Sequence, residues 1–227
     1  MLPRLLRPAY PDAARAIIQM PQLNALVAGH ALSGVVLNAG CGEGGYCAWI
    51  ESQPGVTRID NIDVSVTPDF SIWHPDPRHH VQVGSLTDLP YADASFDAAV
   101  CTEVIEHIPD DRRAVAELAR VMKPGGLLIA SVPLRPAPFD PAHAHADYSV
   151  EEFTALLTAG GFTVEDHRVC FHALIRGLMS YFRAPLITFG ANRTPYIPHI
   201  ALSIIAHADR VLRLGQPWDL VVRARKN

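Results

Sequence analysis

Residues 35–46, with the sequence VVLNAGCGEGGY, place a short apolar run directly before a cluster of glycines. The apolar run predicts a buried strand. The glycines predict a turn with positive φ angles, which other residues avoid. In an α/β protein such a turn leads from a strand into a helix whose first N–H groups can bind an anionic ligand. This segment therefore constrains the chain to a strand, turn and helix unit built around a ligand.

The spacing of the glycines fits two kinds of ligand site. Gly40-x-Gly42-x-x-Gly45 matches the dinucleotide fingerprint, and Gly40-x-Gly42-x-Gly44 matches a nucleoside loop. Both sites use an acidic residue after the next strand to bind ribose hydroxyls. Asp63, in the segment NIDVS, stands at that distance and is predicted to bind a ribose. The alternative role of Asp63 is to cap a helix or to stabilise a turn.

Hydrophobic periodicity predicts strands that alternate with helices. This order favours a parallel sheet with helices on both faces. A Lys-Pro-Gly-Gly breaker at residues 123–126 is predicted to end a helix. The expected strands are 35–38, 57–63, 81–84, 97–101, 127–132, 162–169 and 218–224, and the expected helices are 11–31 in two pieces broken at Pro21, 44–52, 110–122 and 149–159.

Residues 171–215 depart from this alternation. They form a long, apolar, helix-like insertion with predicted breaks around residues 191–198. The insertion can serve as a lid over an apolar acceptor, as extra core, as a dimer face or as a membrane-surface contact. The sequence does not rank these alternatives.

Composition limits the class of partner and the compartment. With 227 residues and 49% hydrophobic content the chain is expected to form one domain. A net charge of -4 offers no basic field, which argues against a nucleic-acid partner. Its four cysteines form no C-x-x-C pair, so we expect buried, reduced thiols in a cytoplasmic protein. The longest uncharged stretch after residue 170 is too short for a membrane span of about 20 residues.

Two further runs extend the pattern beyond the glycine turn and Asp63. They are GSLTDLPYADASFDAAVCTEVIEHIPDD at 84–111 and ELARVMKPGGLLIASVP at 117–133. With them, residues 35–162 resemble the class I S-adenosylmethionine-dependent methyltransferases of the bacterial small-molecule group, the type 11-like methyltransferases. Five separate motifs stand in that family's order.

The resemblance implies a three-layer, Rossmann-like methyltransferase fold of the α/β class. It implies a mostly parallel seven-stranded sheet with an antiparallel last strand and a helical insertion before that strand. The expected single domain has a helical cap at 1–32, a cofactor-binding core at 33–170, the insertion as lid or dimer face at 171–216, and the last strand at 217–227.

The implied function is methyl transfer from S-adenosyl-L-methionine to an oxygen, nitrogen or carbon of a small-molecule acceptor, with S-adenosylhomocysteine as product. A homodimer through 171–216 is a further expectation. One alternative is a non-catalytic cofactor-binding or assembly module on the same fold. The other is an NAD-dependent enzyme, which the SFD and EVIEH segments disfavour.

The resemblance also implies a set of cofactor contacts. Asn38 stands where the family has an acidic residue, and Ser85 also replaces one, so both positions lack a charge that relatives use. The implied contacts are Gly40 and Gly42 under the methionine moiety, Asn38 beside them, Asp63 on the ribose, Val64, Ser85 and Leu86 near adenine, and Thr102 and Glu103 at the methionine end.

A general base is needed when the acceptor is an alcohol, a phenol or a protonated amine. The candidates are His107, His143 and His145, although the latter two also suit a solvent-exposed loop. Glu103 and His107 are expected on one helical face at i, i+4. With Glu106 and a later histidine they can hold a divalent cation, but the same group is widespread in metal-free relatives. We therefore predict no metal and keep metal binding as the alternative.

Overall fold

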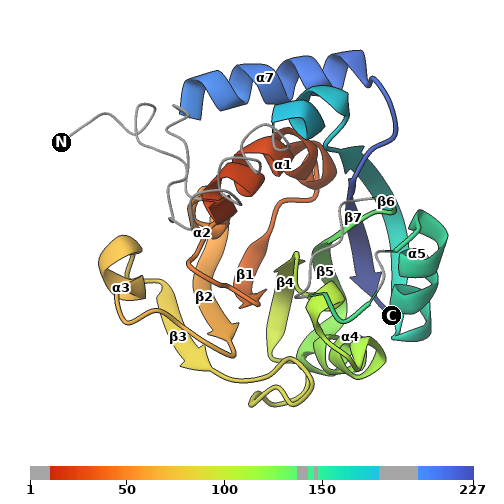
Figure 1. The fold of residues 1–227 in the computed structure, drawn as a ribbon. Helices are drawn as coiled ribbons and strands as arrows, with labels where there is room; N and C mark the ends of the chain where they lie inside the picture. The colour runs from red at the N-terminus through yellow and green to blue at the C-terminus, as the bar shows by residue number, and fades with distance from the viewer. Residues whose placement is uncertain (1–10, 137–142, 146–147, 179–198) are drawn as a thin grey trace.

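The computed structural model describes residues 11–136, 143–145, 148–178 and 199–227. Its core is a seven-stranded sheet with the order β3-β2-β1-β4-β5-β7-β6 (Figure 1). β7 runs antiparallel to both of its neighbours, and the other adjacent pairs are parallel. The predicted mostly parallel sheet with an antiparallel last strand is therefore confirmed.

Each predicted strand is present, with ends that differ by a few residues. The strands are β1 (Ser33–Ala39), β2 (Gly55–Asp63), β3 (His79–Val83), β4 (Phe96–Thr102), β5 (Met122–Pro133), β6 (Phe162–Cys170) and β7 (Asp219–Lys226). The helices are α1 (Pro11–Val27), α2 (Cys47–Glu51), α3 (Phe70–Trp73), the 3-10 helix η2 (Ile105–His107), α4 (Asp111–Val121), α5 (Val150–Ala159) and α7 (His199–Leu212).

Both faces of the sheet are buried, because neighbouring residues of a strand point to opposite sides. Leu37 packs with α4 and α5, whereas Val36 packs with α1, α2 and α7, and both side chains are fully buried. The result is three layers, and α7 lies outside α1 (Figure 1). Within the described ranges, none of the helices combines the length and apolar character that a bilayer span requires.

The prediction that Pro21 divides the first helix is wrong. α1 runs without a break from Pro11 to Val27 and contains Pro21. An internal proline costs about 3 kcal/mol or more. Leu23 and Leu26 are completely buried against the sheet, and each buried leucine contributes about 1.5–3 kcal/mol. Tertiary packing therefore outweighs the local preference.

The Lys-Pro-Gly-Gly segment does not separate α4 from the following strand. β5 begins at Met122, directly after α4, and includes residues 123–126. Met122 pairs with Phe96 and Leu127 pairs with Ala98, so β5 advances by more residues than β4 between these pairs. The proline and glycines thus form an irregularity inside the strand, where Gly125 adopts φ +76°.

Three smaller differences concern helices. α2 begins at Cys47 rather than at residue 44, because the chain first makes tight turns in which Gly44 N donates to Cys41 O and Cys47 N donates to Gly44 O. The short α3 lies in a segment without predicted structure. In the insertion, residues 173–178 and α7 are helical. The predicted breaks at 191–198 lie outside the described residues.

The capping box at the start of α5 links a local sequence pattern to stability. Ser149 Oγ accepts a hydrogen bond from Glu152 N, and Glu152 Oε2 accepts one from Ser149 N. Ser149→Ala is expected to lower the free energy of unfolding by about 1 kcal/mol, because a helix N–H loses its partner. Ser149→Asp, which keeps an acceptor, is expected to retain most of the stability in denaturant titrations. Equal stability of the alanine variant and the wild type would contradict this role.

Candidate active site

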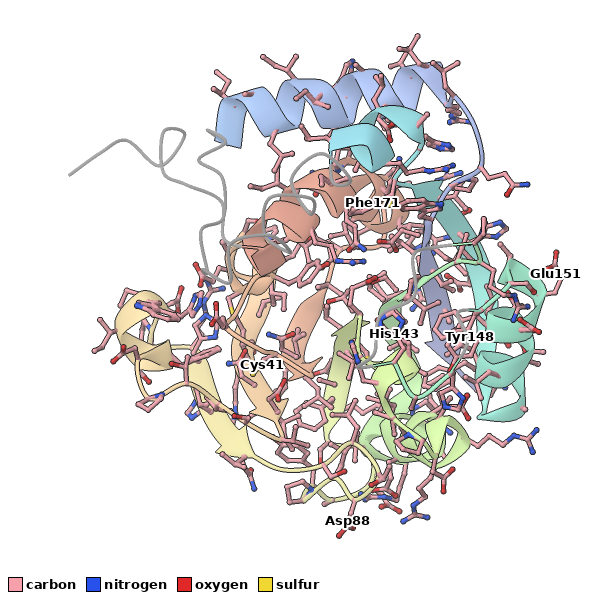
Figure 2. All side chains as sticks on the ribbon, viewed as in Figure 1. Cys41, Asp88, His143, Tyr148, Glu151 and Phe171 are labelled. Atoms are coloured by element: carbon pink, nitrogen blue, oxygen red, sulfur yellow. The ribbon has the colours of Figure 1, made fainter. Side chains whose placement is uncertain are left out.

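A cavity of about 590 Å³ opens where β1, β2 and β4 end. Cys41 and His143, both labelled in Figure 2, belong to its wall. Ligands of open α/β sheets bind at this edge, outside the carboxyl ends of the strands. The predicted site residues found in the wall are Gly40, Gly42, Asp63, Val64, Ser85, Leu86, Thr102, Glu103, His107 and His143. Asn38 and His145 are outside it.

The glycine turn forms one wall of the cavity with bare backbone. Gly40 has φ +74°, and a Cβ added there would lie 2.2 Å from Val104 Cγ2. Gly40 N and Cys41 N both donate to Ile62 O, at 2.8 and 3.0 Å. The turn is therefore tied to the end of β2 and has no room for a side chain at its first glycine.

Asp63 links the turn to the segment that follows β2. Its Oδ2 accepts from Gly42 N at 2.9 Å, and its Oδ1 accepts from Ser65 N at 3.0 Å. The neighbouring Val64 is 71% exposed although it lies on the cavity wall. An apolar side chain left open beside a fixed carboxylate suits a ligand with a polar and a flat apolar part.

Asn38 lies beneath this wall and does not contact the cavity. It is 3% exposed, and its Nδ2 donates to Asn61 Oδ1 at 2.9 Å. Asn61 Nδ2 lies 2.9 Å from His79 Nδ1. Asn38 thus belongs to a buried polar chain between β1, β2 and β3.

A buried polar cluster closes the end of the cavity beside β4. Glu103, which has φ +58°, accepts hydrogen bonds from Arg15 and from Ser131 Oγ, the latter at 2.6 Å. Gln19 Nε2 lies 3.2 Å from Glu103 Oε1 and 3.0 Å from Asp219 Oδ2. The sequence-based prediction missed Arg15 and Gln19. The available signal was the i, i+4 spacing of Arg15 and Gln19, which puts their polar side chains on one face of α1.

The charges in this cluster depend on its burial. Burial alone lowers the pKa of the Arg15 guanidinium, but the charges of Glu103 and Asp219 more than offset this effect and raise it. Burial, together with the charge of Glu103, raises the pKa of Asp219 well above its usual range. Arg15 therefore stays charged at neutral pH, and Asp219 holds its proton more strongly than an exposed aspartate does.

The structure separates the three candidate histidines. His107 and His143 line the cavity, with ring centroids 4.8 Å apart. His145 instead places Nε2 2.8 Å from Ile108 O and lies outside the cavity wall. The loop containing His143 docks on η2, because Ala144 N and His145 N both donate to Glu106 O.

Glu103 and His107 do not form an i, i+4 pair on a helix, so that prediction is wrong. Only residues 105–107 are helical, and Glu103 precedes them with a positive φ. The side chains of Glu106, His107 and His143 come together instead, with one ligand atom from each lying within 4.8 Å of the others. One carboxylate oxygen and two imidazole nitrogens are a donor set that can bind a divalent cation.

All four cysteines have free thiols and are buried. Burial raises the pKa of Cys41, the one nearest the ligand wall, to about 12. A thiol of this kind stays protonated at neutral pH. Cys41 is therefore part of the cavity wall and does not supply a thiolate nucleophile.

Residues 37–130 match the family model for the methyltransferase domain. A probable S-adenosylmethionine-dependent methyltransferase of Mycolicibacterium smegmatis is 36% identical over 144 residues, which are 60% of this chain and 55% of that protein. The O-methyltransferase cnsE of Penicillium expansum is 32% identical over 145 residues, or 58% of this chain and 52% of that protein. The chain thus spans about half the length of these relatives.

Solved structures of low sequence identity share the fold. A Burkholderia thailandensis 1,6-didemethyltoxoflavin-N1-methyltransferase, with its substrate and S-adenosylhomocysteine bound, is 21% identical with a TM-score of 0.61, over 95% of this chain and 78% of that one. The [4+2]-cyclase SpnF is 22% identical with a TM-score of 0.63, over 93% of this chain and 81% of that one. One fold therefore serves more than one reaction, so the reaction has to be inferred from the residues of the site.

The raised pKa of Asp219 gives a test by pH. An acid whose pKa is raised by folding stabilises the fold most below its unfolded pKa of about 4, and this contribution is lost as the pH rises toward the folded value. An asparagine side chain does not titrate, so Asp219→Asn is expected to gain stability relative to the wild type between pH 4 and 8. Thermal unfolding midpoints across this range measure the difference. A difference that stays constant with pH would show that Asp219 is ionised in the folded protein.

Proposed function

We propose that the protein transfers a methyl group from S-adenosyl-L-methionine to a small-molecule acceptor, because residues 37–130 match the family model for the methyltransferase domain. The observation that carries the proposal is the cavity, where the glycine turn, Asp63 and the end of β4 meet. Its volume of about 590 Å³ is in the usual range for small-molecule sites. The acceptor atom is an oxygen, a nitrogen or a carbon.

The cavity wall fits the cofactor in shape and in donor chemistry. Gly40 lines the cavity with bare backbone, and a Cβ added there would overlap the Val104 side chain. We assign ribose binding to Asp63 and adenine contact to Val64, Ser85 and Leu86. Thr102 and Glu103 face the methionine end, where the Glu103 carboxylate suits an ammonium group. When bound, the cofactor supplies a methyl group already activated on a sulfonium.

The chain itself then has to orient the acceptor, exclude water and, where needed, remove a proton. Arg15 and Gln19 hold Glu103 from the side of α1, so that α1 covers this end of the cavity. We assign the role of general base to His107 or His143, because both face the cavity. His145 is held by the Ile108 carbonyl and serves to anchor the loop.

Organisation and partners complete the proposed function. We propose a single domain, supported by the packing of α1 against β6 and β7. Four free thiols are in keeping with a reducing compartment such as the cytoplasm. The acidic net charge of -4 supports a small-molecule partner rather than nucleic acid. The homodimer through residues 171–216 stays a prediction, as the alternative use of that insertion.

Calorimetry with S-adenosylhomocysteine tests cofactor binding. Asp63→Ala removes a charged hydrogen-bond acceptor and is expected to weaken binding roughly 10- to 100-fold. Asp63→Asn, which keeps an acceptor without the charge, should fall between the alanine variant and the wild type. Asp69→Ala, at an exposed aspartate outside the cavity wall, is the matched control and should bind normally. Absence of binding by the wild-type protein would overturn the proposal.

Transfer of a labelled methyl group to a panel of alcohols, phenols and amines tests the assignment of the base. His107→Ala or His143→Ala is expected to lower the rate at least about 100-fold and to remove the acid limb of the pH–rate profile. His145→Ala should keep that limb. Cofactor binding without turnover of any acceptor would favour a non-catalytic module.

The same assay distinguishes a base from a metal centre. We expect the rate to be unchanged by a chelator, with Glu106→Gln keeping the acid limb of the profile. Loss of activity with the chelator and its recovery on adding Mg²⁺ or Mn²⁺ would instead assign Glu106, His107 and His143 to a cation.

A further inference from the structure

α7 presents an apolar stripe on its outer side. Ile200, Ile204 and Val211 are spaced four and seven residues apart, which places them on one face of the helix. Their side chains are 48%, 64% and 64% exposed. Leu212 and Leu214 continue the same region at 54% and 52% exposure. We call these five residues the α7 outer stripe. Side chains extend outward along α7, which lies on the outside of the molecule (Figure 2).

The opposite side of α7 already packs against the protein. Leu202 and Ala206 are buried in the core cluster that includes residues of α1. Asp209 is 3% exposed and accepts hydrogen bonds from the backbone N–H groups of His172, Leu174 and Ile175. The outer stripe is therefore a second apolar face, which packing within the described part of the chain does not require.

The segment of the sequence that contains the stripe is basic in an otherwise acidic protein. Residues 171–217 contain five arginines and one acidic residue, Asp209, whose carboxylate faces inward. The whole chain has a net charge of -4, so the rest of it has a net charge of -8. A basic segment of this kind attracts an anionic surface, whereas the acidic remainder of the protein repels one.

The arginines beside the stripe are also not neutralised by carboxylates. Most arginines of the described part form an ion pair, as Arg120 does with Glu117 and Asp93. Arg210 instead lies 3.2 Å from His207 Nδ1, and Arg213 donates to Arg210 O. Neither makes an ion pair with a residue in the described ranges. No carboxylate in these ranges offsets their positive charges, and Arg213 is exposed whereas Arg210 is partly buried.

We propose that the α7 outer stripe docks on an anionic lipid surface. In this arrangement the aliphatic side chains enter the boundary between headgroups and acyl chains, and Arg210 and Arg213 meet lipid phosphates. A second copy of the chain is the less suitable occupant, because an interface through this face brings the arginines of both copies together. The docking adds a peripheral membrane contact that methyl transfer itself does not require.

Flotation of the full chain with lipid vesicles tests the proposal. The protein is expected to bind vesicles of phosphatidylcholine with about one third phosphatidylglycerol, and to bind pure phosphatidylcholine at least tenfold more weakly. Ile204→Glu should reduce binding to the anionic vesicles tenfold or more. Arg210→Gln and Arg213→Gln should each reduce it roughly fivefold, with the loss disappearing at high salt.

Ile72→Glu is the matched control, since Ile72 is 73% exposed on α3 and lies outside the stripe. It should bind vesicles like the wild type, and all variants should keep the wild-type unfolding midpoint and affinity for S-adenosylhomocysteine. Equal losses for Ile72→Glu and Ile204→Glu, or no preference for anionic vesicles, would overturn the proposal. So would a wild-type dimer that ignores vesicles and that Ile204→Glu dissociates, because the stripe would then be an interface between copies.

Discussion

The contact between Arg15 and Glu103 joins α1 to the end of β4 at one end of the candidate site. Arg15 belongs to α1, at the start of the described chain, and Glu103 follows β4. Asp219 at the start of β7 takes a second hydrogen bond from the same guanidinium at 3.0 Å. A buried charge is costly unless it is paired and hydrogen-bonded. The side chains of Asp219 and Glu103 are 1% and 13% exposed and that of Arg15 is 35% exposed, so the pairing offsets the cost of burying the two carboxyl groups and fixes α1 over the ends of β4 and β7.

The order of the strands explains why residues distant in sequence meet at this point. β1 lies between β2 and β4, so the glycine turn after β1 has Asp63 on one side and Glu103 on the other. The parallel direction of these strands brings all three ends to one edge of the sheet. The loop with His143 then completes the wall by hydrogen-bonding to Glu106 O through Ala144 N. Topology supplies the cavity, and individual side chains supply its chemistry.

The strands and the glycine turn were predictable because each depends on a local pattern. The run 35–37 is apolar on both faces, and Gly40 sits where only glycine fits. The continuity of α1 through Pro21 was not predictable, since it depends on packing against a distant part of the sheet. The role of Arg15 was hidden for the same reason, because its partners Glu103 and Asp219 are 88 and 204 residues away in sequence. A positive φ at Glu103 likewise has no signal in a sequence that is typical of a helical turn.

Asn38 stands where relatives have an acidic residue, and another residue of the site can supply the missing carboxylate. An acidic side chain buried at this position would be costly, because Asn38 is 3% exposed and its amide N–H donates to Asn61. The amide satisfies that hydrogen bond without introducing a charge. The carboxylate at this end of the cavity is Glu103, which Arg15 and Ser131 hold in place. In the proposed complex the ammonium group of the cofactor then faces a carboxylate at the end of β4 rather than one on β1. Because Arg15 also binds the Glu103 carboxylate, it competes with the ammonium group and weakens that attraction.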